Sequence, residues 1–513
     1  MTSRPTLRGA ALAGVTGAVS LATVLAPTGA LAARAPVATT GPTSSVSPYV
    51  LPAADGVSIT SLWSVGDTAG NHYRMVGIPD GLGVSVGEGG LDVYLNHELT
   101  AGAGIVRDHD QKGAFVSHEV IDPATGAVVS GDDLIKTVKY WDYTSSSYVS
   151  AAGVLAPFSA AFARFCSGAL TAPGQLWDAT SSTGYDGQVY FANEENGANG
   201  RAFGVTADGI ATQLPHLGLF SWENTLAAQT GTQRTVVMGD EDDAAGQLRV
   251  YRGTKQADGS PVEQAGLTDG TLHVVKVDGV ASAATPALRT TAGFTKGVTK
   301  RFTLPEIDWT QSGAAQNAEA LTDGTTFNRI EDGAFDPRNP NDYYFLTTEG
   351  GDTTQAEPGV TRDGGGLWRL RYDDVSHPEL GGTVTLLLDG TEAPFLNKPD
   401  NMTIDTHGNL LMQEDPGGNA HLARIVAYRI EDGARGVVAE FDPARFAAGA
   451  HGLITTDEES SGIIDVSSQV GRKGTFLFDA QVHKANADPE LVEEGQLLTM
   501  TVQAWGQVYR ITG

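Results

Sequence analysis

The chain has 513 residues, with 61 acidic against 33 basic side chains and a formal net charge of −28. A surface this acidic repels nucleic acid and anionic lipid, so it argues against both as partners. It can gather hard cations such as Ca²⁺, although an acidic surface also serves solubility alone. The 64 glycines, 23 prolines and many short Val, Tyr, Phe and Leu runs favour an all-β chain.

Residues 1–32 have the pattern of a secretory signal peptide. Arg4 and Arg8 precede an apolar stretch that ends at the small residues Ala30 and Ala32, which are typical of a cleavage site. We therefore predict a secreted protein, with 33–50 as a linker and 51–513 as one domain. No other stretch is apolar enough to span a membrane, and we expect a monomer.

A short β-prone run that ends in acidic residues recurs six times. The copies are residues 91–98, 188–195, 235–243, 343–349, 409–415 and 475–483. Six such strands with long insertions between them predict a single six-bladed β-propeller, with each run as the inner strand of a blade, while five or seven blades stay open. Residues 506–511 are expected to pair with a strand near residues 59–63 and close the ring.

The strand ends of this propeller would bring acidic side chains to one rim of the central channel. The residues are Glu98, Glu194, Glu195, Asp240, Glu241, Glu349, Glu414, Asp415 and Asp479. So many carboxylates in a small volume need cations to offset their repulsion, which predicts a metal cluster. The alternative is that they are ordinary turn residues, but Glu is not favoured in turns.

Several segments, in this order, resemble the secreted PhoX-type alkaline phosphatases. The matching segments are 96–98, 165–168, 194–195, 217–223, 239–241, 329–333, 368–369, 399–401, 414–415 and, more loosely, 479–483. The chain departs from the family pattern at Leu219, Trp222 and Val482. It is therefore similar to a divergent member.

The resemblance implies a six-bladed propeller that hydrolyses phosphate monoesters with Fe³⁺ and Ca²⁺ at the channel mouth. Cys166 would ligate iron, and Glu223 and Glu331 would be iron ligands at the catalytic centre. The calcium ligands would be Glu98, Glu194, Asp240, Asp400 and Glu414, with Glu195, Glu241 and Asp415 as further metal candidates. Arg329 would donate paired hydrogen bonds to the phosphate, or it would form a salt bridge with a neighbouring acid.

Two other functions stay open from the sequence. One is a calcium-dependent propeller hydrolase of the lactonase or phytase type, and the other is a propeller that binds Ca²⁺ without catalysis. Neither gives Cys166 a metal role. Residues 83–87 fit the G-x-S-x-G pattern, but no helical pattern follows them, so we do not expect a nucleophile elbow there.

Overall fold

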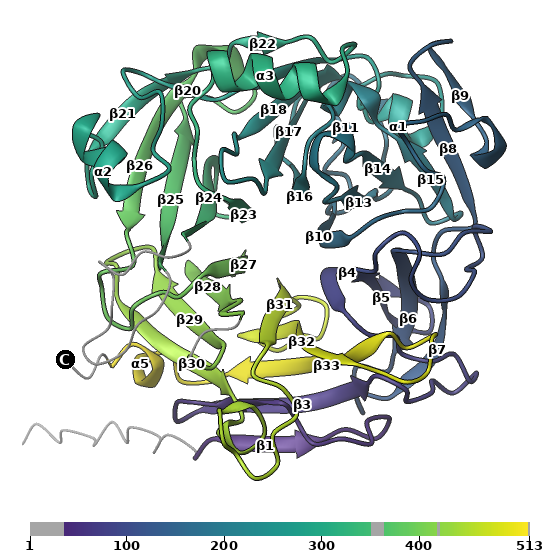
Figure 1. The fold of residues 1–513 in the computed structure, drawn as a ribbon, viewed down its shortest axis with the longest axis vertical. Coiled ribbons are helices and arrows are strands. Elements are labelled where there is room, and N and C mark those ends of the chain that lie inside the picture. Colours follow the sequence, from purple (N-terminus) through teal and green to yellow (C-terminus); the bar gives the residue numbers. More distant parts are fainter. Residues whose placement is uncertain (1–34, 350–363, 418–420, 511–513) are drawn as a thin grey trace, which may run out of the picture. The chain divides into compact units, whose positions relative to one another are not determined.

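Six β-sheets stand around a common axis, with the strands of each sheet stacked outward from the centre (Figure 1). The computed structural model describes residues 35–349, 364–417 and 421–510, and the predicted signal peptide lies outside them. All six sheets belong to one compact unit that begins at Arg34. The predicted six-bladed, all-β propeller is confirmed.

Each blade is one mainly antiparallel sheet whose strands follow one another from the axis outward. Blade 1 contains β4 (Pro79–Gly87), β5 (Gly90–His97), β6 (Phe115–Ile121) and β7 (Val128–Asp133). Blade 2 contains β10 (Phe165–Leu170), β13 (Tyr190–Glu194), β14 (Ala202–Val205), β15 (Ile210–Gln213), β8 (Thr137–Asp142) and β9 (Ser147–Val149). Blade 3 contains β16 (Trp222–Ala227), β17 (Arg234–Glu241), β18 (Arg249–Thr254), β19 (Thr271–Val274) and β22 (Glu306–Ile307).

The other three blades complete the ring. Blade 4 contains β23 (Ile330–Asp336), β24 (Asn339–Glu349), β25 (Gly364–Tyr372), β26 (Gly382–Leu388), β21 (Thr299–Thr303) and β20 (Lys276–Val277). Blade 5 contains β27 (Pro399–Ile404), β28 (Asn409–Glu414), β29 (Arg424–Arg429), β30 (Arg435–Phe441) and β2 (Val50–Pro52). Blade 6 contains β31 (Glu458–Asp465), β32 (Thr475–Ala485), β33 (Glu493–Val502), β3 (Val57–Ser64) and β1 (Val37–Thr40).

Helices and short strands fill the connections between these sheets. The helices are α1 (Pro261–Gln264), α2 (Pro286–Thr291), α3 (Gly313–Asp323), α4 (Pro443–Phe446) and α5 (Trp505–Val508). The 3₁₀ turns are η1 (Ala151–Gly153), η2 (Gly197–Asn199), η3 (Pro215–Leu217) and η5 (Pro378–Leu380), and β11 (Trp177–Asp178) pairs with β12 (Thr183–Gly184). Within the described residues, no helix is long and apolar enough to cross a membrane.

The six acid-ended runs are the second strands of the blades, so their predicted place on the axis is wrong. The innermost strands are β4, β10, β16, β23, β27 and β31 (Figure 1). A second strand packs against the neighbouring blades on both faces and reads as an apolar run, as β13 and β28 do with every residue buried. The innermost strands carry polar residues toward the channel and lack that signature.

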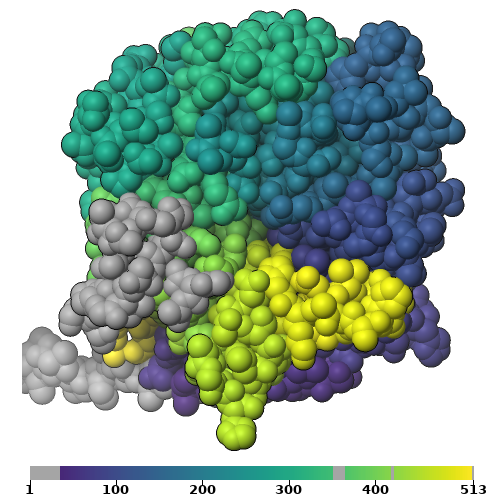
Figure 2. Space-filling model, in the orientation of Figure 1, coloured from purple at the N-terminus to yellow at the C-terminus, as the bar shows by residue number. Residues whose placement is uncertain are grey.

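The ring closes inside blade 6, where the N-terminal β3 pairs antiparallel with the C-terminal β33, and Ile59 lies opposite Met500. Figure 2 shows the purple N-terminal residues beside the yellow C-terminal segment. A strand near 59–63 was expected, but its predicted partner was wrong, because residues 505–508 form α5. The structure also differs from the linker expected over 33–50, since β1 pairs with β3 and Val50 is buried against blade 5.

Candidate metal centre

A β-bulge recurs at the start of five innermost strands and supplies the residues of the centre. In each, the register with the second strand shifts by one residue, between 79 and 82, 165 and 168, 222 and 225, 330 and 333, and 399 and 402. The residues that open these bulges are Asp80, Cys166, Glu223, Glu331 and Asp400. A bulge re-aims its side chain away from the regular pleat. These five therefore point into one volume although they come from different blades.

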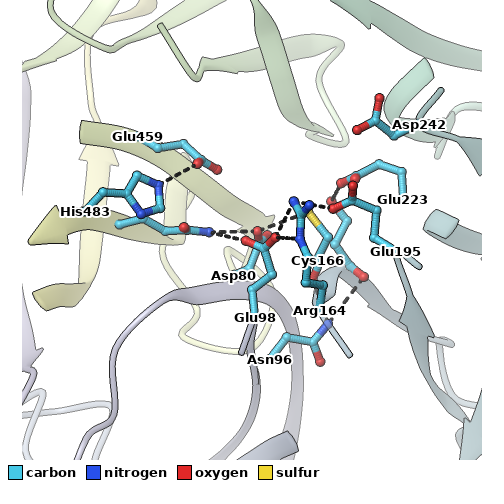
Figure 3. A network of polar contacts seen from close by, with 12 residues as sticks. Asp80, Asn96, Glu98, Arg164, Cys166, Glu195, Glu223, Asp242, Glu459 and His483 are labelled. Carbon is cyan, nitrogen blue, oxygen red and sulfur yellow. Dashed lines mark hydrogen bonds and ion pairs between the residues drawn. The ribbon is translucent and has the colours of Figure 1, made fainter. Parts of the chain in front are cut away.

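The donor atoms of these side chains lie close enough to share bound ions. Three groups each have one donor atom per residue, and within a group these atoms lie within 4.8 Å of one another. The groups are Asp80 with Glu98 and Cys166, Cys166 with Glu195 and Glu223, and Glu223 with Glu331 and Asp400. Figure 3 shows Cys166 between Asp80 and Glu98 on one side and Glu195 and Glu223 on the other. The groups overlap, so they form one continuous centre.

Direct contacts between neighbouring blades hold this centre in place. The Cys166 thiol donates to Asp80 at 3.4 Å, and the Ser167 hydroxyl donates to Glu223 at 2.7 Å. Asn401 donates to Asp80 at 3.2 Å and to Ser167 at 2.7 Å. Gly81 lies against the backbone of Ser167 and Gly168, where a Cβ would clash, so a glycine lets β4 approach β10.

The centre carries more negative charge than its burial tolerates without cations. Burial, followed by repulsion from Asp242, raises the pKa of Glu223 to about 8. Burial and the neighbouring acids also hold the pKa values of Asp80, Glu331 and Asp400 well above the ordinary range. The same causes raise the pKa of the Cys166 thiol. Bound cations would reverse these shifts.

Two arginines partly offset this charge at the mouth. Arg164 contacts Glu98 at 2.7 Å and Glu195 at 2.5 Å (Figure 3). Arg329 donates to Asp242 at 2.8 and 2.9 Å and lies 3.2 Å from Glu331. Both arginines have left-handed backbone angles, with φ of 47° and 42°. The side chain of Arg164 is 46% exposed and that of Arg329 is 37% exposed, so both remain partly open to solvent.

The left-handed backbone conformation recurs at the same position in four blades, at the channel mouth. Arg164 and Arg329 each lie two residues before the residue that opens a bulge, as do Ile78 and Lys398, with φ of 53° and 44°. The carbonyl of Ile78 accepts a hydrogen bond from the Glu98 N–H at 2.9 Å, and that of Lys398 accepts one from Asp415 at 3.0 Å. Non-glycine residues rarely adopt this conformation, and such strain concentrates at functional sites.

Most of the acids at the ends of the second strands fall into two sets. Glu98, Glu195 and Asp415 lie at the mouth, together with Asp242, which the sequence analysis did not select. Glu194, Glu241 and Glu414 face the other way and form buried ion pairs with Arg201, Arg249 and Arg424. Successive strand residues point to opposite faces, so adjacent acids cannot both reach the channel. These three carboxylates are therefore left out of the metal set proposed below.

Asp240 and Glu349, two other acids predicted at the channel mouth, have hydrogen-bond or ion-pair partners within the protein. Asp240 accepts a hydrogen bond from Tyr343 at 2.5 Å, whereas Glu349 pairs with Arg289 away from the centre. Asp80 and Glu459 also lie at the centre, and Glu459 is buried close to Asp415 and Glu98. Both acids stand at the start of their strands, β4 and β31, so the pattern of an apolar run that ends in acids does not find them. Residues 83–87 lie inside the continuous strand β4, which confirms that they form no nucleophile elbow.

The residues present fit a mixed metal centre. Oδ1 of Asp400 accepts no hydrogen bond from the described part of the chain, although Asp400 is buried. A buried acceptor without a donor is costly, and a cation would satisfy it. The donor set combines one soft thiol with several carboxylates, which suits a transition metal at Cys166 and hard cations beside it.

The fold and the centre together define a propeller enzyme with a buried acidic and thiol site. The profile of the family "Alkaline phosphatase PhoX" matches residues 205–468. The chain belongs to this family, and it is accordingly a phosphomonoesterase.

One solved structure with a TM-score above 0.5 supports the fold. Pseudomonas fluorescens PhoX in complex with vanadate, a transition state analogue, is 13% identical, covers 88% of this chain and 97% of its own, and has a TM-score of 0.60. The GH93 α-L-arabinofuranosidase of Fusarium graminearum, in complex with arabinobiose, is 8% identical over 88% of this chain and 98% of its own, with a TM-score of 0.39. No curated protein sequence matches the chain.

Proposed function

We propose that the chain is a secreted phosphomonoesterase whose channel mouth binds Fe³⁺ and Ca²⁺. The observation that carries the proposal is the position of Cys166, whose thiol shares two groups of closely spaced donor atoms with acids from other blades. A lone thiol among carboxylates is unexpected in a site built for Ca²⁺ alone. Export rests on residues 1–32, and a monomeric state is our expectation.

The metal ligands that we propose form two sets at the channel mouth, one for iron and one for calcium. Cys166, Glu223, Glu331 and Glu195 would hold iron, and Asp80, Glu98, Asp400 and Asp415 would hold calcium. When bound, these ions supply Lewis acidity at the phosphate and a nucleophile at neutral pH. The described residues around the centre therefore need to supply positioning and charge rather than a nucleophilic side chain.

Arg329 is the side chain we assign to the phosphate. Its guanidinium is held in a fixed plane by the two hydrogen bonds to Asp242, and it borders Glu331 at the mouth. A planar guanidinium can donate two parallel hydrogen bonds to a phosphate group. Arg329 would thus orient the ester above Glu223 and Glu331 and stabilise the charge that develops on the phosphoryl oxygens.

The test is hydrolysis of 4-nitrophenyl phosphate by protein purified without chelator. We expect activity that chelation abolishes and that Fe³⁺ with Ca²⁺ restores, while Ca²⁺ alone does not. Full restoration by Ca²⁺ alone would favour the calcium-dependent hydrolase instead. Absence of phosphatase activity in protein with both metals bound would refute the proposal.

A further inference from the structure

Arg164 has in blade 2 the position that Arg329 has in blade 4. Each lies two residues before the residue that opens the bulge of its innermost strand, with φ of 47° and 42°. Each guanidinium contacts acids of the channel mouth through Nε and Nη2. Within the part of the chain that the structure describes, neither Nη1 atom has an acceptor. Arg164 therefore keeps donors for a ligand, as Arg329 does.

The backbone on both sides of Arg164 is fixed. The Arg164 N–H donates to the Leu99 carbonyl at 2.9 Å, and the Arg164 carbonyl accepts from the Glu195 N–H at 2.9 Å. Its Nε atom donates to Glu98 at 2.7 Å. A planar guanidinium that is held through two of its nitrogens presents the third in a defined direction. The Nη1 donors are thus preorganised, which lowers the entropy cost of binding a ligand.

Arg164 lies at the entrance to the metal centre. Its Nη2 atom is 2.7 Å from Glu98 and 2.5 Å from Glu195, and these acids belong to the two groups of donor atoms that share Cys166. Figure 3 shows the guanidinium between the two acids. Cys166 is buried, whereas the Arg164 side chain is 46% exposed. A ligand that enters the mouth on this side therefore meets the guanidinium before it meets Cys166.

Arg164 is also close to the place assigned to the phosphate. Glu195, which contacts Arg164, shares a group of donor atoms with Glu223, and Glu223 shares the next group with Glu331. Within each group these atoms lie within 4.8 Å of one another, and Glu331 lies 3.2 Å from Arg329. A substituent on a phosphate that Arg329 binds over Glu223 and Glu331 thus needs to extend only past Glu195 to reach Arg164.

The acids around Arg164 do not argue against an anionic ligand. The phosphate of a monoester is itself an anion and binds in the same centre, so the bound cations of the proposed function must already outweigh the carboxylates. Glu98 and Glu195 are proposed metal ligands, and their negative charge would then be shared between a cation and Arg164. The guanidinium does not deprotonate in proteins. Its positive charge is then balanced only in part, so an anion is the ligand that fits it.

We propose that Arg164 binds a second anionic group of the substrate, so that the enzyme prefers phosphate monoesters whose alcohol carries a further anion, such as a carboxylate, near the ester bond. This inference rests on the proposed function. Arg329 would bind the phosphate that is cleaved, and the Nη1 donors of Arg164 would bind the second anion through charge-assisted hydrogen bonds. An ester of an uncharged alcohol lacks this second contact.

The test compares two esters that differ in one substituent. 2-Phosphoglycolate carries a carboxylate where ethyl phosphate carries a methyl group, and kcat/KM for each is measured from the released phosphate. We expect Arg164→Met to lower the ratio of kcat/KM for 2-phosphoglycolate to that for ethyl phosphate about tenfold or more, and Arg164→Lys to restore part of it. Lys398→Met, at the same backbone position in blade 5, is the matched control and should keep the wild-type ratio.

The ratio distinguishes recognition of the second anion from a general defect. A loss of metal ions or of structure in a variant would lower kcat/KM for both esters and leave their ratio unchanged. A ratio that is the same in Arg164→Met and in wild type would therefore overturn the inference, whatever the absolute activities. A ratio that falls in Lys398→Met but not in Arg164→Met would overturn it as well.

Binding without turnover separates this inference from the proposed function. 3-Phosphonopropionate and propylphosphonate have a methylene group in place of the ester oxygen, so they mimic the two esters but cannot be hydrolysed, and their binding to protein purified without chelator is measured by calorimetry. We expect wild type and Lys398→Met to bind 3-phosphonopropionate about tenfold more tightly than propylphosphonate, and Arg164→Met to lose this preference. Equal affinities in wild type would overturn the inference. If the preference is present but neither ester is hydrolysed, the proposed function fails and the second anion site stands.

Discussion

Replacing Glu223 with Gln should stabilise the chelator-treated protein at alkaline pH, although it removes a proposed metal ligand. Glu223 is buried, accepts a hydrogen bond from Ser167 at 2.7 Å and lies close to the carboxylates of Glu331 and Asp400. Glutamine keeps the shape of the side chain and removes its charge. In metal-free protein, the loss of repulsion should therefore outweigh the loss of the carboxylate.

The sign and size of this effect follow from the pKa of Glu223, which burial raises from 4.5 to about 8. Between these values the unfolded chain has released a proton that the folded chain still holds, so stability falls as pH rises through this window. The full shift corresponds to about 5 kcal/mol, and because the neighbouring acids titrate together we expect about 2–4 kcal/mol. The change should be complete above pH 8 and absent near pH 4.5.

The assay is urea unfolding of chelated wild type and Glu223→Gln at pH 5 and pH 9. The two proteins should have similar unfolding free energies at pH 5, and the variant should be more stable at pH 9. Glu194→Gln is the control, since it would leave Arg201 buried without its charge partner and cost about 3–5 kcal/mol. If Glu223→Gln is no more stable than wild type at pH 9, then repulsion between the buried carboxylates does not destabilise the metal-free protein.

Three further predictions concern the phosphate, Glu119, which is a buried acid of β6, and the ions. Arg329→Met should lower kcat/KM for 4-nitrophenyl phosphate about 100-fold. Arg301→Met, which removes an exposed ion pair with Asp373, should leave kcat/KM unchanged. Equal losses in the two variants would contradict the phosphate-binding role of Arg329. Burial raises the pKa of Glu119 to about 8, so Glu119→Gln should raise the melting temperature at pH 9 but not at pH 5, with exposed Glu88→Gln neutral at both. Exhaustive chelation should lower the unfolding free energy by about 2.7 kcal/mol for each site whose ion was previously present at a free concentration of a hundred times its Kd. An unchanged unfolding curve would exclude structural ions.

The ring of six blades could be predicted because its second strands are buried on both faces and end in acids. The same pattern assigned these strands to the axis, since Asp80 and Glu459 stand at the start of their innermost strands rather than at the end of an apolar run. Cys166, Glu223, Glu331 and Asp400 were found through family motifs rather than through periodicity. Their convergence depends on bulges, which insert one residue and leave no reliable mark in a single sequence.

The paired acids show what a sequence pattern leaves open. In the pair Glu194 and Glu195, a shift of one residue decides which carboxylate reaches the channel and which enters the blade. One signal could have separated them, because the buried acid is paired with an arginine at the start of the next strand or directly before it. Arg201 lies seven residues after Glu194, and Arg249 lies eight after Glu241. An acid pair followed by an arginine at this distance indicates that the first acid faces the blade.

The most direct test of the metal centre is the iron and calcium content of wild type and Cys166→Ser, both purified without chelator and measured with their visible absorption. A thiolate bound to Fe³⁺ should give wild type a visible absorption band and stoichiometric iron. The variant should keep its fold and much of its calcium but lose the iron, the colour and phosphate ester hydrolysis. A variant that retains iron and full turnover, or a wild type that holds calcium alone, would contradict the iron centre at Cys166.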